Sequence, residues 1–286
     1  MQGILIPIGG NEDKGIGKNE MYTLEFIGKG ILANVVKESG GTDAKIVVIT
    51  TASSIPQEIG QNYMEAFNKL GCRNVIILDI RDREKSEEPE ILQIILDADC
   101  VLFSGGDQSK IVDFIGATSL HQLLFKKLEQ THFVLAGTSA GAMCMSKEMI
   151  KGGHSSDALF KGGVLMRDGM GFLDDVIIDS HFIQRGRFGR LTEAVATFPH
   201  LLGIGLAEDT GLIIRNGNDC EVVGSGMVII FDPSDLQHNN VAVLKPGLPV
   251  SITNLKVNIL ADGDKYFLDE RRVAVMTLEE YDRIQA

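Results

Sequence analysis

A serine flanked by small residues is the clearest candidate nucleophile. Ser139 lies in the motif Gly137-Thr138-Ser139-Ala140-Gly141, after the apolar run 133–136 and before an apolar segment with helical character. This is a G-x-S-x-G pattern in the strand–turn–helix context that a nucleophile elbow requires. The N–H of Ala140 would point to where an oxyanion forms. The pattern predicts a serine nucleophile, and the alternative is a strand–helix turn that merely needs glycines.

A second glycine turn could supply another oxyanion donor. Gly105-Gly106-Asp107-Gln108 follows the predicted strand 100–103. In a parallel sheet both turns open at the same edge, where ligands bind. The backbone N–H of Gly106 is therefore the candidate second donor. The alternative is that Asp107 only caps a helix that begins at Gln108.

A serine nucleophile needs a base with a pKa near neutrality, and histidine is the usual one. His181 ends the predicted strand 176–178, whereas His154, in the loop beyond the serine turn, is the competing candidate. A purely structural role for His181 is the other alternative. Glu208 or Asp209 could orient the base, unless they form only a turn or a cap.

Three arginines lie within six residues, although the chain carries a net charge of -12. Arg187 and Arg190 are spaced i, i+3 and would share a helix face with each other, close to Arg185. The guanidinium group matches carboxylate geometry, so one interpretation is a pocket that binds carboxylates. Internal salt bridges to the chain's own acids are an equally good interpretation.

The elements that must position these residues follow an α/β pattern. Short continuous apolar runs occur at 4–8, 45–50, 75–78, 100–103 and 133–136, separated by segments of helical period that include 22–36 and 58–70. This predicts a doubly wound, mostly parallel sheet. After about residue 170, short strand candidates, among them 203–206, 212–214 and 241–244, predict antiparallel additions at the sheet edge. We find no repeat or linker, so we expect one domain over 1–286, with the strands from about 211 as its extension.

Composition excludes several classes of protein. The chain has 286 residues, with 27 Lys and Arg against 39 Asp and Glu, so nucleic acid and anionic membranes are poor partners. Its four cysteines form no metal-binding pattern and predict reduced, buried thiols in a cytoplasmic protein. No apolar run approaches the length of a membrane span.

Taken together, the motifs resemble the cyanophycinase family, serine peptidases related to aspartyl dipeptidase. The resemblance runs in order from residue 3 to about residue 230 and rests on five motifs: Gly9-Gly10-Asn11-Glu12-Asp13-Lys14; Gly105-Gly106-Asp107-Gln108; Gly137-Thr138-Ser139-Ala140-Gly141-Ala142; Asp179-Ser180-His181-Phe182 with Arg185, Arg187 and Arg190-Leu191; and Glu208-Asp209-Thr210.

The resemblance implies a fold like that of class I glutamine amidotransferases and a serine-type exopeptidase. The implied substrate is cyanophycin, a poly-aspartate with arginine on each side-chain carboxyl, cleaved at β-aspartyl linkages to β-Asp-Arg dipeptides. It also implies a homodimer without cofactor or metal. By this resemblance Ser139 is the nucleophile, His181 the base and Glu208 the acid that orients the base. The implied oxyanion donors are Gly106 and Ala140. The residues implied to contact the substrate are Gln108, Asp179, Ser180, Arg185, Arg187 and Arg190.

One position departs from the family pattern. Ser180 stands where the family usually has glutamine, so a short hydroxyl replaces a long amide and the details of substrate binding are open. Two other functions remain as alternatives: an aspartyl dipeptidase-like enzyme for short aspartyl peptides, and a non-catalytic binding protein on the same fold.

Overall fold

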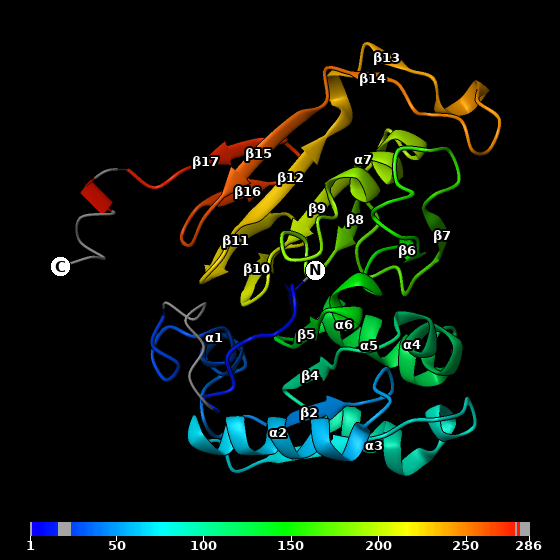
Figure 1. The fold of residues 1–286 in the computed structure, drawn as a ribbon. Helices are drawn as coiled ribbons and strands as arrows, with labels where there is room; N and C mark the ends of the chain where they lie inside the picture. The colour runs from blue at the N-terminus through cyan, green and yellow to red at the C-terminus, as the bar shows by residue number, and fades with distance from the viewer. Residues whose placement is uncertain (1, 17–23, 278, 281–286) are drawn as a thin grey trace.

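The structure is a computed structural model that describes residues 2–16, 24–277 and 279–280. Within these residues the main sheet has nine strands in the order β17-β16-β11-β10-β1-β5-β4-β2-β3 (Figure 1). Its parallel part consists of β1 (Ile4–Ile8), β5 (Val134–Thr138), β4 (Cys100–Phe103), β2 (Ile46–Ile49) and β3 (Val75–Leu78). The parallel sheet predicted from the apolar runs is thereby confirmed.

Helices cover both faces of this parallel part. They are α1 (Ile31–Glu38), α2 (Pro56–Lys69), α3 (Pro89–Asp97), α4 (Gln108–Ile115), α5 (Ser119–Gln130) and α6 (Ala140–Met143). The remaining helix, α7 (Phe188–Thr197), packs on a second sheet instead. Side chains of β1 divide between two cores: Leu5 packs into the core that contains α3, α4 and α5, whereas Ile6 packs with α1 and α2. Strands buried on both faces explain why the sequence shows continuous rather than alternating apolar runs.

Antiparallel strands extend the sheet beyond β1. β10 (Thr210–Arg215) pairs with β1 and is followed by β11 (Asp219–Gly224), β16 (Lys265–Phe267) and β17 (Arg272–Ala274). Four other late strands form a separate sheet, ordered β15 (Lys256–Leu260), β12 (Val228–Asp232), β9 (Leu202–Leu206) and β8 (Val176–Asp179). The prediction that all late strands add to one sheet edge is therefore wrong in part.

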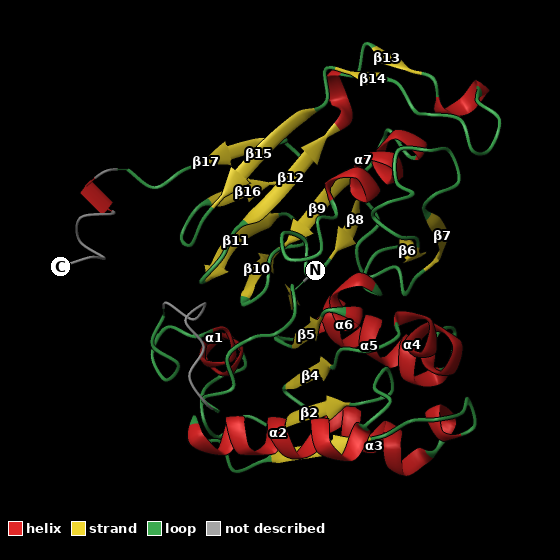
Figure 2. Cartoon of the chain, viewed as in Figure 1, coloured by secondary structure: helices red, strands yellow, loops and turns green. Residues whose placement is uncertain are grey.

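Several smaller elements complete the described chain (Figure 2). They are the strand pair β6 (Glu148–Gly152) and β7 (Leu165–Asp168), the pair β13 (His238–Asn239) and β14 (Ile252–Thr253), and three 3-10 turns at Lys85–Glu87, Pro233–Asp235 and Val241–Val243. The strand predicted at 241–244 is thus a 3-10 turn. The helix predicted over 22–36 begins only at Ile31, after Gly28 and Gly30, which disfavour helix; residues 22 and 23 lie outside the described residues.

The two sheets meet where β1 ends, and backbone hydrogen bonds join the loops there. The Ser139 N–H donates to the carbonyl of Ile8 at 2.8 Å, the His181 N–H to that of Gly9 at 2.8 Å, and the Asp209 N–H to that of Gly10 at 2.9 Å. The segments that follow β5, β8 and β9 are therefore tied to the last residue of β1 and to the two glycines after it. Across the described residues, we find no helix with the length and apolar character of a membrane span.

Candidate active site

Ser139 lies on a sharp turn between β5 and α6. Its backbone has φ 51° and ψ -108°, a left-handed conformation that costs energy for a residue with a side chain. The flanking glycines are required by space: a Cβ on Gly137 would lie 2.3 Å from the Gly141 carbonyl oxygen, and one on Gly141 would lie 2.2 Å from that of Phe103. The turn has the geometry of a nucleophile elbow, as the motif predicted.

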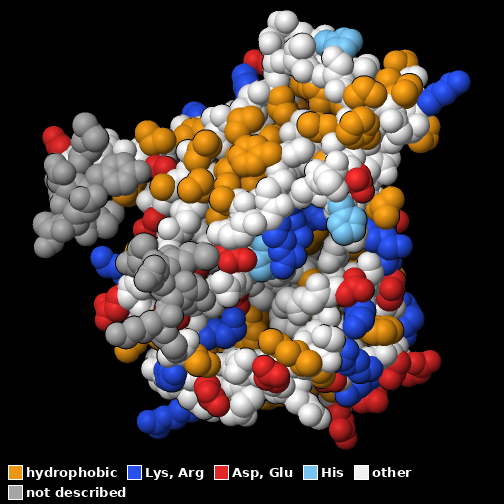
Figure 3. All heavy atoms as spheres, viewed as in Figure 1, with side chains coloured by type: hydrophobic (Ala, Val, Ile, Leu, Met, Phe, Trp, Pro, Cys, Tyr) orange, Lys and Arg blue, Asp and Glu red, His pale blue; other side chains and the backbone are white. Residues whose placement is uncertain are grey.

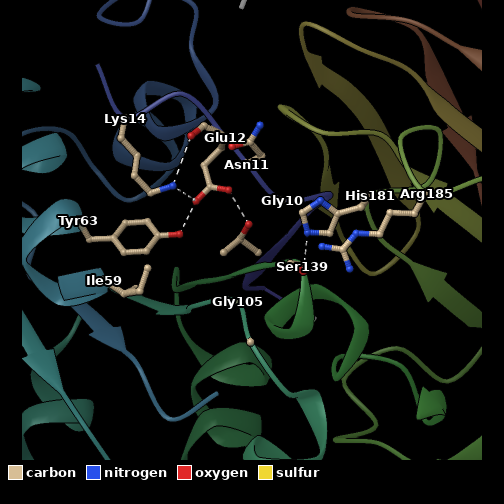
Figure 4. Close-up of a pocket in the computed structure, with 12 residues that line it drawn as sticks. Gly10, Asn11, Glu12, Lys14, Ile59, Tyr63, Gly105, Ser139, His181 and Arg185 are labelled. Atoms are coloured by element: carbon tan, nitrogen blue, oxygen red, sulfur yellow. Dashed lines mark hydrogen bonds and ion pairs between the residues drawn. The ribbon is translucent and has the colours of Figure 1, made fainter. Parts of the chain in front are cut away.

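Three side chains from distant parts of the chain form one hydrogen-bonded line (Figure 4). The Nε2 atom of His181 is 2.9 Å from the Oγ of Ser139, and its Nδ1 is 2.6 Å from the Oε1 of Glu208. The Glu208 carboxylate therefore favours the tautomer in which Nδ1 carries the proton and Nε2 accepts from the serine hydroxyl. The arrangement can deprotonate Ser139 as its oxygen attacks a carbonyl carbon.

The segment after β1 completes the surroundings of these three side chains, a role that the sequence did not predict. Asn11 Nδ2 donates to the second oxygen of Glu208 at 2.9 Å. Gly10 lies flat against the imidazole, since a Cβ there would come within 2.5 Å of two ring atoms of His181. The signal that could have revealed this was the position of Gly9-Gly10 at the carboxyl end of a predicted parallel strand.

The geometry favours His181 over His154 and Glu208 over Asp209 for the roles of base and orienting acid. Asp209 accepts from the Asp13 N–H at 2.9 Å and from the Ser225 hydroxyl at 2.6 Å, so its carboxylate holds the loop together, whereas Glu208 contacts His181. His154 lines a different hollow, beside Phe160 and Lys161, rather than the cavity that contains Ser139.

The surroundings of His181 favour the neutral form of its ring. Burial lowers the pKa of His181 below its ordinary value, and the Arg185 and Arg187 guanidinium groups lower it further, while the contact with Glu208 opposes the shift. A neutral imidazole is the form that can accept the serine proton. A lowered pKa means that this form persists to lower pH, so activity should extend further into the acid range.

Removal of the nearby cation should reverse part of this shift. We expect Arg185→Gln to raise the pKa of His181 and so to move the acid limb of the kcat/KM against pH profile to higher pH. The exposed Arg73→Gln serves as the matched control, because Arg73 lies outside the cavity. An acid limb that stays in place in Arg185→Gln would show that this charge does not act on the base.

Both residues predicted to be oxyanion donors lie close to Ser139. Gly106 lines the same cavity as Ser139 and has φ +142°, and a Cβ there would lie 2.1 Å from the Ala52 carbonyl oxygen. Ala140 is the first residue of α6 and directly follows Ser139. Asp107 also caps α4 by accepting from the Ser109 N–H at 2.9 Å, so the capping interpretation holds as well.

Ser139 and His181 border a cavity of about 260 Å³. On the face drawn in Figure 3, Lys or Arg side chains and a His side chain lie together near the centre. The residues that line the cavity are Gly10, Asn11, Glu12, Lys14, Ile59, Tyr63, Gly105, Gly106, Thr138, Ser139, His181 and Arg185.

Of the three clustered arginines, the structure brings only Arg185 into this cavity. Asp179 is fully buried at the end of β8 and accepts from Arg190 Nε at 2.8 Å and from Arg187 Nη1 at 2.8 Å. Arg187 also donates to the Ser180 carbonyl at 2.7 Å. For Arg187 and Arg190 the geometry favours internal salt bridges, and Asp179 is their partner rather than a surface of the cavity.

The two other predicted substrate contacts also point elsewhere. Gln108 Nε2 donates to the backbone carbonyls of Ile150 at 2.8 Å and Lys151 at 3.1 Å, and so anchors β6. The Ser180 hydroxyl is buried and contacts the sulfur of Met143 at 3.3 Å. Neither side chain lines the cavity around Ser139.

Solved structures share the fold. A crystal structure of a peptidase from an acI-B1 actinobacterium aligns with a TM-score of 0.66 and 22% identity, covering 93% of this chain and 97% of that one. A putative peptidase E protein from Listeria monocytogenes aligns with a TM-score of 0.52 and 16% identity, covering 78% and 98%.

Sequence relatives are more specific. A protein named cyanophycinase from Trichormus variabilis is 36% identical to this chain over 269 residues, which cover 94% of this chain and 87% of the relative. The one from Geminocystis herdmanii is 34% identical over 262 residues, covering 92% of both. Residues 27–222 match the family described as Peptidase family S51. The chain therefore belongs to peptidase family S51 and is a serine-type peptidase.

Proposed function

We propose that this peptidase degrades cyanophycin, with Ser139 as nucleophile, His181 as general base and Glu208 as the acid that orients the base. The observation that carries the proposal is the continuous line from the Ser139 hydroxyl through His181 to Glu208, with distances of 2.9 and 2.6 Å. The substrate follows from the relatives named cyanophycinase, which align over more than nine tenths of this chain.

In the first half of the reaction, the Ser139 oxygen attacks a substrate carbonyl carbon while its proton passes to Nε2 of His181. The backbone N–H groups of Gly106 and Ala140 then stabilise the oxyanion; loss of one such donor typically costs about 10²–10³ in kcat. The C–N bond breaks as the protonated imidazole gives its proton to the leaving amine. The acyl group stays on Ser139 as an ester, and His181 is neutral again.

In the second half, water replaces the amine. His181 Nε2 takes a proton from the water while the water oxygen attacks the ester carbonyl, and the same two N–H groups stabilise the oxyanion. The C–O bond to Ser139 then breaks, and the imidazole returns the proton to the serine oxygen. The products are a free carboxylate and the original enzyme.

The expected product defines the bond that is cleaved. A β-Asp-Arg dipeptide still contains the amide between arginine and the β-carboxyl group of aspartate. Its release therefore requires hydrolysis of the main-chain amide between successive aspartyl residues. The expectation that the enzyme cuts the β-aspartyl linkage itself does not fit this product, and the carbonyl that Ser139 attacks is the α-carbonyl.

The charges around the cavity suit this polymer. Each repeating unit carries one free carboxylate, on its arginine, and one guanidinium group. The exposed Arg185 lines the cavity beside His181 and would bind a carboxylate of the unit that leaves. Ser180 is buried and its hydroxyl contacts the sulfur of Met143, so the exchange of glutamine for serine at this position should affect packing there rather than a direct substrate contact.

Incubation of the purified protein with insoluble cyanophycin, followed by mass spectrometry of the soluble fraction, tests this function. We expect β-Asp-Arg as the dominant product. An α-linked Asp-X dipeptide serves as the comparator. Hydrolysis of that dipeptide with the polymer left intact would instead indicate an aspartyl dipeptidase-like enzyme, and inertness toward both would indicate a binding protein.

Other expectations accompany this function as proposals. We infer one folding unit over 1–286, because β10 and β11 share a sheet with β1, and a parallel sheet of the class I glutamine amidotransferase-like type. All four cysteines are buried and free, which suits the reducing cytoplasm. A homodimer, expected from the family resemblance, is checked by light scattering on the purified protein.

A further inference from the structure

A second buried charge cluster lies in the same cavity, away from His181. The Glu12 carboxylate is almost fully buried, and its oxygens accept from three side chains. Thr138 donates to Oε2 at 2.6 Å, the Tyr63 hydroxyl donates to Oε1, and Lys14 Nζ lies 3.0 Å from Oε1. These groups come from the segment after β1, from α2 and from β5. The cluster thus fixes the Lys14 ammonium group at the cavity wall.

The electrostatics keep Glu12 ionised. Burial tends to raise the pKa of Glu12, but the charge of Lys14 and the hydrogen bonds from Thr138 and Tyr63 outweigh this, and the pKa lies below its ordinary value. A carboxylate whose oxygens already accept three donors is a poor site for a substrate cation. The Lys14 ammonium group would also repel such a cation.

Lys14 retains capacity to bind an anion. An ammonium group has three N–H donors. Within the described part of the chain, one is directed to Glu12 Oε1, and a weak second contact of 3.4 Å reaches the Glu12 carbonyl oxygen. The side chain is 21% exposed, and its Nζ lies 4.9 Å from the centre of the Tyr63 ring. A donor therefore remains for a group that enters the cavity.

Two cations thus line one cavity together with the nucleophile. Arg185 lies beside the His181 ring, whereas Lys14 lies with Tyr63 on the other side of the cavity (Figure 4). The leaving amine must lie next to His181, because that ring supplies its proton. The side of the cavity with Lys14 therefore receives the acyl unit of the substrate.

We infer that Lys14, held in place by Glu12, binds the free carboxylate of the acyl unit and so selects substrates that carry an anion there. This inference rests on the proposed function, in which each unit carries one arginine carboxylate. Lys14 is a substrate-binding residue in this account, and Glu12 and Tyr63 position it. The cavity would then hold one cation for each of the two units joined by the scissile bond.

A pair of synthetic two-unit fragments tests the inference. One fragment has both arginine carboxylates free, and the other has the carboxylate of the N-terminal, acyl unit converted to a carboxamide. We expect Lys14→Met to lower kcat/KM for the free fragment about tenfold, mainly through KM, because a charged hydrogen bond is lost. The preference of the wild-type enzyme for the free fragment should disappear in this variant.

Control variants separate binding from folding. Lys14→Arg keeps the charge and should keep most of the preference, and Lys37→Met removes an exposed lysine of α1 and should behave as wild type. Equal losses on both fragments in Lys14→Met would overturn the inference, because a purely structural lysine does not distinguish them.

The test also distinguishes this inference from the function on which it rests. A wild-type enzyme that cleaves neither fragment nor the polymer would refute the proposed function. A wild-type enzyme that cleaves both fragments equally well would leave the function intact and refute the role of Lys14.

Discussion

Replacement of Ser139 by alanine should lower kcat on cyanophycin by about 10⁶-fold, the loss typical of a missing serine nucleophile in such a triad. The variant should fold normally, since alanine meets the same backbone constraint at φ 51° without adding atoms. Rates of β-Asp-Arg release, measured beside thermal unfolding curves, give both quantities. The residual rate would come from the oxyanion donors and from binding alone.

A matched serine provides the control for this experiment. Ser156 is exposed and bonds to Asp157 at 3.2 Å, outside the cavity, so Ser156→Ala should keep wild-type turnover. If the turnover rate of Ser139→Ala stays within tenfold of the wild-type rate, another group must attack the substrate. Mass spectrometry of the product easily resolves a tenfold difference in rate.

Replacement of Asp179 by alanine should have the largest effect on stability, lowering the free energy of unfolding by about 3–5 kcal/mol. The reason is that Asp179 is fully buried and is shared by the Arg187 and Arg190 guanidinium groups. Without it, two cations remain near the interior with no carboxylate. Urea denaturation monitored by circular dichroism measures the change.

Two further variants make this prediction specific. Asp113 pairs with Arg167 at 2.8 Å, but its side chain is 53% exposed, so Asp113→Ala should cost at most about 1 kcal/mol. Asp179→Asn keeps an oxygen that accepts hydrogen bonds, so its loss of unfolding free energy should lie between those of Asp113→Ala and Asp179→Ala. It provides a measurement even if Asp179→Ala fails to fold. Equal stabilities for Asp179→Asn, Asp113→Ala and wild type would show that the buried pairs contribute little.

The line of Ser139, His181 and Glu208 could be anticipated from sequence for a simple physical reason. Each residue follows a short apolar run, and strand ends of a parallel sheet gather at one edge. A serine flanked by glycines after a strand is also typical of a sharp turn. Spacing along the chain did not distinguish Glu208 from Asp209, because both follow β9 and only their side-chain directions differ.

The roles of Arg187 and Arg190 could not be predicted in the same way. A guanidinium group binds a substrate carboxylate or an internal one with the same geometry. The outcome depends on Asp179, which faces inward at the last position of β8. Inward or outward orientation at a strand end is set by the register of the sheet, and the apolar run alone does not specify it.

Gly10 and Asn11 contact His181 and Glu208 because of the order of strands in the sheet, which the sequence does not reveal. β1 lies between β10 and β5, so the segment after it meets the segments after β5, β8 and β9. Hydrophobic patterning indicates which residues form strands but not which strands are neighbours. The same limit explains why the late strands, expected at one edge, divide among three sheets.

Covalent labelling tests the nucleophile assignment most directly. A fluorophosphonate probe reacts with a serine whose hydroxyl is activated by a neighbouring base, so peptide mapping by mass spectrometry should find one adduct, on Ser139. Labelling should be abolished in Ser139→Ala and strongly slowed in His181→Ala. An adduct on a different residue, or labelling of Ser139 that does not depend on His181, would contradict the account.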